Sequence, residues 1–225
     1  MRWPRAYATA GAPAVSRPEP APARKALREG RAVRPHRLLD LRQGRRAVRT
    51  LRYPHGDVLV VSGLPGGGKS TLMRRAAGGA RLIDSQDVRE RWQARVPRLV
   101  PYALYRPLVR IAHYTGLWRA LRSGDSVVLH DCGTLRWVRA WVGRHARRRG
   151  RNMHLVLLDV PVRTALDGQR ERGRRVSAYA MARHRDASRR LLAGTQAGRL
   201  PKACASVVLL DREAARELEA IDFDG

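Results

Sequence analysis

The segment that most constrains the fold is residues 63–70, which read Gly-Leu-Pro-Gly-Gly-Gly-Lys-Ser. They fit the pattern G-x-x-x-x-G-K-[ST], one residue after the apolar run VLVV and before residues of helical character. In such a strand, loop and helix, glycines let backbone N–H groups close around phosphate oxygens, and the helix presents its positive end to the anion. The sequence therefore predicts a P-loop nucleotide-binding domain.

Each part of this phosphate cradle has an expected role. Lys69 is expected to reach the β- and γ-phosphates, and the Ser70 hydroxyl is expected to bind Mg²⁺. ATP and Mg²⁺ are thus the expected cofactors. The predicted nucleotide-binding residues are Gly63, Leu64, Pro65, Gly66, Gly67, Gly68, Lys69, Ser70 and Thr71.

The apolar runs of the chain indicate the fold class. Five short runs, each ending near a polar residue, span residues 58–63, 80–85, 126–131, 153–160 and 206–211, and segments of helical character lie between them. Continuous apolar runs are typical of parallel strands covered on both faces. We therefore predict an α/β fold, a five-stranded doubly wound parallel sheet with helices on both faces. A ligand site is expected where the strands end, near Asp84, Asp131, Asp159 and Asp211.

Composition divides the chain into two parts. Residues 1–35 are rich in Pro, Ala and Arg without a hydrophobic period, so they are predicted to be a disordered basic tail. Residues 36–225 are predicted to form the P-loop domain, with a short helix and a strand over residues 36–52. The formal net charge is +27, but only three of the 46 basic residues are lysines. A solvated arginine-rich surface and a polyanionic partner both account for this charge.

Cysteine spacing and hydropathy indicate the compartment. Cys132 and Cys204 lack the spacing of a zinc site or a disulfide framework. No segment approaches the roughly 18 consecutive apolar residues of a transmembrane helix, and the first residues lack the uninterrupted apolar core of a signal peptide. We expect a reduced, cytoplasmic protein, and the sequence does not indicate its oligomeric state.

Missing signals narrow the class of P-loop protein. N-K-x-D is absent, as is D-x-x-G after the third strand, which argues against a GTPase. The third strand ends in His130-Asp131 rather than the Asp-Glu expected of a motor or helicase. A compact phosphotransferase remains, with an arginine-rich lid at about residues 168–190, which hold eight arginines. Arg170 and Arg172 precede Gly173, a plausible hinge, and are predicted to neutralise the transferring phosphoryl when the lid closes.

Several segments in order carry a family resemblance: GLPGGGKST, LIDSQDVR, VVLHD, LLDVPVRTALDGQRERG and AYAMARHRDASRRL. Over about residues 57–196 the chain resembles the P-loop kinases grouped around phage polynucleotide 5′-kinase and the zeta-toxin kinases, also described as AAA-type ATP-binding proteins. It is more distantly similar to adenylylsulfate kinase and chloramphenicol phosphotransferase. The resemblance implies an ATP- and Mg²⁺-dependent kinase that moves the γ-phosphoryl to an acceptor hydroxyl.

The resemblance also implies residues for the acceptor. In that family an aspartate after the second strand acts on the acceptor hydroxyl, and a nearby basic residue holds the substrate, a role that Arg89 fits. The family's aspartate position is Gln86 here, which cannot take a proton. Asp84 is therefore the preferred base, although it also fits a helix N-cap, and Asp87 is the alternative. Asp131 is expected to bind Mg²⁺ with Ser70 or to position the acceptor.

The acceptor itself stays open. Residues 97–123 lie where this family usually builds its acceptor pocket, and they mix aromatic residues with arginines. Such a mixture suits a nucleic-acid 5′-hydroxyl end, an apolar small molecule, a membrane surface or plain core packing. Two other functions are compatible with the sequence: a nucleic-acid-associated or regulatory ATPase without an acceptor, and an interaction protein whose nucleotide is structural.

Overall fold

A computed structural model describes residues 31–44, 48–97, 99–131, 136–171, 173 and 177–224. Residues 1–30 of the expected tail lie outside these ranges, as do Cys132 and Arg172. In chain order the elements are β1 (Ala32–Val33), β2 (Arg37–Asp40), η1 (Arg42–Gly44), β3 (Thr50–Pro54), β4 (Val58–Gly63), α2 (Lys69–Ala76), β5 (Arg81–Ile83), α3 (Ser85–Arg95), α4 (Tyr102–Ser123), β6 (Val127–Asp131), α5 (Arg136–Arg147), β7 (Met153–Leu158), α6 (Val162–Arg170), α7 (Ala178–Gln196), β8 (Cys204–Leu210), α8 (Arg212–Glu217) and β9 (Ala220–Asp224).

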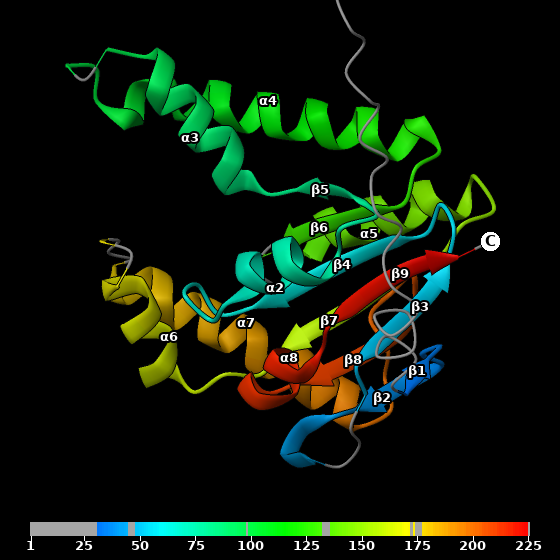
Figure 1. The fold of residues 1–225 in the computed structure, drawn as a ribbon. Helices are drawn as coiled ribbons and strands as arrows, with labels where there is room; N and C mark the ends of the chain where they lie inside the picture. Colours follow the sequence, from blue (N-terminus) through cyan, green and yellow to red (C-terminus); the bar gives the residue numbers. More distant parts are fainter. Residues whose placement is uncertain are drawn as a thin grey trace, which may run out of the picture.

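The centre of the molecule is a parallel sheet with the strand order β2-β8-β7-β4-β6-β5 (Figure 1). The α/β doubly wound architecture is confirmed, and all five expected strands are present. The sheet has six strands rather than five, because β2 pairs with β8 along its full length. β4 lies between β6 and β7, so the loop that follows it lies near the middle of the carboxyl edge, where the strand order of this fold class reverses.

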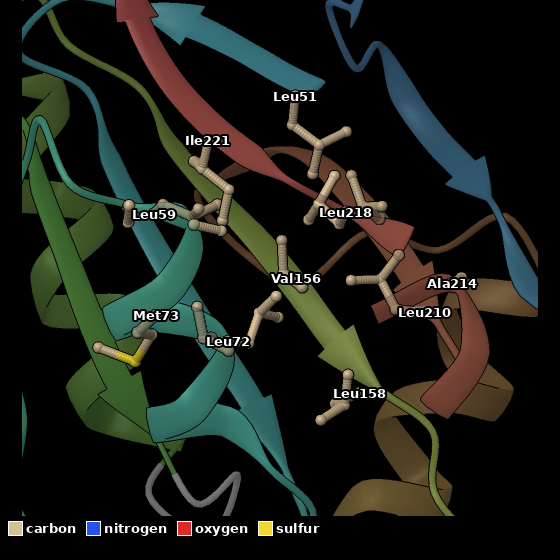
Figure 2. Close-up of a cluster of buried hydrophobic side chains, with 14 of the residues drawn as sticks. Leu51, Leu59, Leu72, Met73, Val156, Leu158, Leu210, Ala214, Leu218 and Ile221 are labelled. Atoms are coloured by element: carbon tan, nitrogen blue, oxygen red, sulfur yellow. The ribbon is translucent and has the colours of Figure 1, made fainter. Parts of the chain in front are cut away.

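Alternating residues of the strands bury both faces of this sheet. In β4, Leu59 and Val61 belong to one core cluster, whereas Val58 and Val60 belong to a second cluster on the opposite face. Helices α2 and α8 cover the first face, and helices α4, α5 and α7 cover the second. Figure 2 shows the first cluster, in which side chains of α2 meet those of β7, β8 and α8. These two packed layers hold the strand ends in fixed positions around the P-loop.

A second, smaller sheet was not expected from the sequence. Its strands β1, β3 and β9 are parallel, and β3 and β9 pair from Thr50 with Ala220 to Pro54 with Asp224. Leu51 of β3 and Ile221 of β9 are buried and belong to the first core cluster, so the small sheet shares this core with the main sheet (Figure 2). Residues 36–52, expected to contain a short helix and a strand, thus contain β2, the short η1 and the start of β3. β1 lies within residues 1–35 and pairs with β3.

Helices α3 and α4 form a hairpin that extends away from the main sheet (Figure 1). Val88 of α3 packs on Tyr105 and Val109 of α4 in a small core of its own. The C-terminal half of α4 instead packs on the sheet through Leu117 and Leu121. α4 accounts for most of the segment 97–123. Of the helices in the described ranges, none combines the length and apolar character needed to cross a membrane.

Candidate active site

The P-loop joins β4 to α2, and its glycines are required by the local geometry. A Cβ atom on Gly66, whose φ is +84°, would lie 2.0 Å from the carbonyl oxygen of Ala165. Gly68 has a φ of +95° and occupies the N-cap position of α2, where no described side chain caps the helix. Both backbone conformations disfavour residues with side chains. The loop therefore brings its backbone close to α6 and leaves the start of α2 uncapped, as an anion-binding helix N-terminus requires.

Helix α6 packs against the P-loop through two residues whose role in the loop was not predicted from the sequence. Gln169 Nε2 donates a hydrogen bond to the carbonyl oxygen of Pro65 at 3.0 Å. A Cβ atom on Gly168 would lie 2.5 Å from the carbonyl oxygen of Gly66. Gly168 was the signal in the sequence that could have indicated this contact, because an isolated glycine in a helical segment often has a packing reason, such as the close approach of another backbone. The first residues of the expected lid segment therefore buttress the phosphate cradle.

Lys69 lies inside the cradle, as its place in the motif requires. Its side chain is buried, and Nζ donates hydrogen bonds to the carbonyl oxygens of Gly63 and Leu64 at 2.8 and 2.7 Å. These bonds hold the ammonium group among the loop amides. The structure thus concentrates positive charge at the centre of the P-loop, where an anion would be most strongly attracted.

Asp84 connects the P-loop helix with β5, β6 and α3. Its Oδ2 accepts a hydrogen bond from the Ser70 hydroxyl at 2.6 Å, and its Oδ1 accepts one from the Gln86 backbone N–H at 2.9 Å. The second bond makes Asp84 the N-cap of α3. His130 Nδ1 lies 3.2 Å from Asp84 Oδ1, but without hydrogen-bond geometry. Asp84 is therefore both a strand-end carboxylate and a helix cap.

The surroundings of Asp84 set its ionisation. Burial raises the pKa of the carboxyl, but the neighbouring His130, the Ser70 hydroxyl and the Gln86 N–H outweigh burial and hold the pKa well below its usual range. Asp84 is consequently a carboxylate at neutral pH. An ionised, hydrogen-bonded oxygen beside the Ser70 hydroxyl is the kind of donor that hard cations prefer.

Asp131 ends β6 and forms a buried ion pair. Its Oδ2 accepts a hydrogen bond from Arg139 Nη1 of α5 at 2.6 Å, and the two residues are 9% and 6% exposed. Asp131 is aligned with Ser62 of β4, which places it beside the strand that leads into the P-loop. Arg139 was not singled out from the sequence, because its partner lies eight positions away and belongs to a different element, β6.

A cavity of about 560 Å³ adjoins Asp84 and opens between α3, α4, β6, α5 and α7. Ser85 and His130, the neighbours of Asp84, line it, whereas Asp84 itself does not. Arg89 also lines the cavity, and its guanidinium carbon lies 4.4 Å from the ring centroid of Tyr102. The other charged, histidine and tyrosine residues of the lining are Arg106, Arg110, Arg139, Arg183, His113, His184, Tyr102, Tyr114 and Asp131.

This cavity, which we call the acceptor cavity, is strongly basic. Five of its lining residues are arginines, and Asp131 is the single carboxylate among the lining residues in the described part of the chain. Burial lowers the pKa of His113, so this imidazole is neutral at neutral pH. The segment 97–123 contributes to the cavity through residues of α4. The geometry favours a ligand that carries negative charge.

Two other predicted residues lie away from this cavity. Asp87, the alternative base, is on the outer side of α3 and accepts a hydrogen bond from Arg74 at 2.7 Å. Arg170 is 78% exposed at its side chain and donates to Asp167 of the same helix at 3.0 Å. Arg172 falls outside the described residues. The structure thus brings Lys69, Ser70 and Asp84 together and places Arg89 and Asp131 at the adjoining cavity.

A family model described as an AAA domain, AAA_33, matches residues 58–195. This range begins at β4 and ends in the last turn of α7, so it contains the P-loop and the acceptor cavity. No curated protein matches the chain in sequence. Family membership, together with the P-loop geometry, implies that a nucleotide binds in the cradle.

Several solved structures share the overall arrangement at low similarity. Shikimate kinase from Acinetobacter baumannii is 17% identical with a TM-score of 0.45, and the match covers 72% of this chain and 87% of that chain. The PezAT toxin–antitoxin structure of Streptococcus pneumoniae is 13% identical with a TM-score of 0.49, covering 77% and 73%. The tunicamycin resistance protein of Deinococcus radiodurans is 16% identical with a TM-score of 0.42, covering 72% and 92%. These values are too low to assign an activity or a substrate to this chain.

Proposed function

This chain belongs to the AAA domain family of P-loop proteins, and from that premise we propose that it is an ATP- and Mg²⁺-dependent phosphotransferase. It would move the γ-phosphoryl of ATP to an acceptor hydroxyl. One observation carries the proposal: Asp84 bonds the P-loop residue Ser70, while its neighbours Ser85 and His130 line a second cavity. An ATPase needs only the cradle, whereas a phosphotransferase needs an acceptor site beside the phosphates.

The donor half consists of the cradle. Lys69 and the loop amides would hold the β- and γ-phosphates. The Ser70 hydroxyl at the start of α2 and the Asp131 carboxylate at the end of β6 are oxygen donors of the kind that suits Mg²⁺, so these two residues would hold the metal. When bound, the metal neutralises charge on the phosphate oxygens.

The acceptor half depends on Asp84 and His130. In the transfer, the acceptor oxygen forms a bond to the γ-phosphorus, the bond from that phosphorus to the β–γ bridging oxygen breaks, and ADP leaves. The acceptor loses its proton, which we assign to Asp84; because Asp84 does not line the cavity, the proton would pass through His130, which lines the cavity and whose Nδ1 lies 3.2 Å from Asp84 Oδ1. Phosphoryl transfer has a loose transition state in which positioning matters more than early proton removal. A carboxylate of low pKa can therefore orient the acceptor hydroxyl and take its proton late.

The charge of the acceptor cavity suggests the acceptor class. Five arginines face one carboxylate, and that carboxylate is already paired with Arg139. We propose that the acceptor carries negative charge besides its hydroxyl, and that Arg89 holds it. A nucleic acid with a 5′-hydroxyl and a small phosphorylated or carboxylated hydroxyl compound both meet this requirement. Arg170 and Arg172 are proposed to act from the lid on the transferring phosphoryl.

The test is a transfer screen with γ-labelled ATP. Acceptors would be 5′-hydroxyl DNA and RNA, sugar phosphates, hydroxy acids, and neutral nucleosides, sugars and aminoglycoside- or chloramphenicol-like compounds. We expect label in one anionic acceptor class, no transfer by Lys69→Ala, and a raised KM for the acceptor in Arg89→Ser. Transfer to neutral acceptors only would reject the proposed acceptor class. ATP hydrolysis without a labelled product for every acceptor would favour a regulatory ATPase.

A further inference from the structure

We infer a second ligand site in the groove between α5 and α7, suited to a small phosphate-bearing molecule with an aromatic ring, such as a mononucleotide. The groove contains a cavity of about 480 Å³, a size typical of small-molecule sites. Residues of α5, of α7 and of the segment before β8 line it. It includes no P-loop residue and shares only Arg139 with the acceptor cavity. The site is therefore separate from the donor and acceptor sites of the proposed reaction.

The positive charge around this α5–α7 cavity favours an anionic ligand. Its lining contains five basic residues and, among the described residues, no acidic one. Arg139 is neutralised by Asp131, but within the described part of the chain the other four have no ion-pair partner. These four cations, which repel one another around one cavity, are Arg136, Arg190, Arg199 and Lys202. A phosphate group would relieve this repulsion and accept paired hydrogen bonds from guanidinium groups.

The rest of the lining suits an aromatic ring. Trp137 is 57% exposed and borders the cavity together with apolar residues that include Leu191 and Pro201. The Trp137 ring also contacts Tyr114 of α4, with ring centroids 5.7 Å apart, so one side of the indole is already packed. An aromatic base stacks well on such a partly exposed indole, and nearby arginines strengthen the contact. Ring and phosphate together describe a mononucleotide.

The backbone holds the walls of this cavity close together. A Cβ atom on Gly143 of α5 would lie 2.5 Å from the Cβ atom of Ala203, so this glycine lets the segment before β8 approach α5. Ala203 has a φ of +70°, a left-handed conformation that is uncommon for alanine. That turn follows Pro201 and Lys202 directly and positions both residues at the cavity. The site is thus formed by packed backbone rather than by arginine side chains alone.

Equilibrium dialysis of the full chain with labelled AMP tests the charge requirement. The pocket variant Arg190→Ser/Arg199→Ser is compared with the matched control Arg147→Ser/Arg148→Ser, which removes the same charge from exposed positions at the end of α5. We expect the pocket variant to bind one AMP fewer per chain, or to bind it about tenfold more weakly, while the control matches wild type. Equal binding by the two variants would overturn the site.

A second comparison tests the aromatic ring and separates the site from the active site. Trp137→Ala should weaken AMP binding by about tenfold but leave ribose 5-phosphate binding unchanged, and Trp137→Phe should restore AMP binding. Equal effects on both ligands would overturn the aromatic part. Lys69→Ala should abolish phosphoryl transfer yet retain this AMP site, so failure of the proposed function leaves the result interpretable.

Discussion

Asp84 makes three contacts through one carboxylate, and these contacts define what it can do. It accepts hydrogen bonds from Ser70 and from the start of α3, and it lies beside His130. Asp87, only three positions further, contacts Arg74 on the outside of the same helix. Of the two aspartates between which the sequence left the choice of base open, Asp84 alone is connected to both the P-loop and the acceptor cavity.

We expect Asp84→Asn to reduce turnover by about 100-fold or more, because positioned proton acceptors contribute rates of that order. Nucleotide affinity should change far less, since the P-loop amides and Lys69 are untouched. Asp87→Asn is the matched control and should keep wild-type turnover. Steady-state kinetics with the identified acceptor provides the measurement. Equal turnover for Asp84→Asn and wild type would exclude Asp84 as the base.

The low pKa of Asp84 also makes the free energy of unfolding depend on pH. Because the folded pKa lies below the ordinary value of 3.8, the unfolded chain takes up the proton first as the pH falls. The contribution of Asp84 is therefore complete above pH 3.8 and lost progressively below it. We expect the difference in unfolding free energy between wild type and Asp84→Asn to be larger at pH 7 than at pH 3. Urea unfolding at both pH values measures it, and a difference independent of pH would contradict the structure.

At the scale of elements, α6 is as much a part of the cradle as the P-loop itself. Gly168 lets the helix approach Gly66, and Gln169 bonds the loop carbonyl of Pro65. The helix therefore fixes the backbone on which the phosphate-binding N–H groups depend. Changes in α6 should alter nucleotide binding without touching a residue of the P-loop motif.

Gly168→Ala tests this role of α6. Its new Cβ atom would lie 2.5 Å from the Gly66 carbonyl oxygen, so the loop or the helix must shift. We expect nucleotide affinity to fall by about tenfold, the equivalent of about 1.4 kcal/mol. Gly116→Ala is the control, because this helical glycine of α4 has open space around it and alanine favours helices by up to about 1 kcal/mol. Unchanged affinity in Gly168→Ala would show that α6 does not hold the loop.

The central strands and the P-loop could be predicted because their signals lie within short stretches of the sequence. The strands that flank the P-loop are continuous apolar runs, and the glycine spacing specifies the loop, so the central sheet and the cradle followed from the sequence. β2 and β3 were harder, because each is short and its partner strand lies near the other end of the chain. Gln169 was missed for the same reason, since its partner Pro65 is 104 positions away. The ion pair of Asp131 and Arg139 depends on how α5 packs, which no sequence period reveals.

At the scale of the whole molecule, buried side chains of the small sheet complete the first core cluster of the main sheet. β9 lies at the end of the described chain and pairs with β3, and its Ile221 is 1% exposed in the same cluster as Leu59 and Val156 of the main sheet. Residues near both ends of the domain therefore stabilise the layer that supports the P-loop helix α2. The domain should unfold as a unit when this layer is weakened.

Ile221→Ala should lower the free energy of unfolding by about 2–5 kcal/mol, the cost of a large cavity in a packed core. Asp222→Ala is the neighbouring control, because Asp222 is exposed and its replacement should change stability by less than about 0.5 kcal/mol. Urea denaturation followed by tryptophan fluorescence provides both values. A loss as small for Ile221→Ala as for Asp222→Ala would show that β9 is not part of the cooperative core.

The central claim is that the cradle delivers a phosphoryl group to a second molecule. The fate of the γ-phosphate measures this most directly: γ-labelled ATP is incubated with the protein and a charged hydroxyl acceptor, and the label in acceptor phosphoester is compared with the label in inorganic phosphate. We expect most of the label in the phosphoester for wild type and in neither product for Lys69→Ala. Label that appears only as inorganic phosphate, whichever acceptor is supplied, would contradict the phosphotransferase assignment.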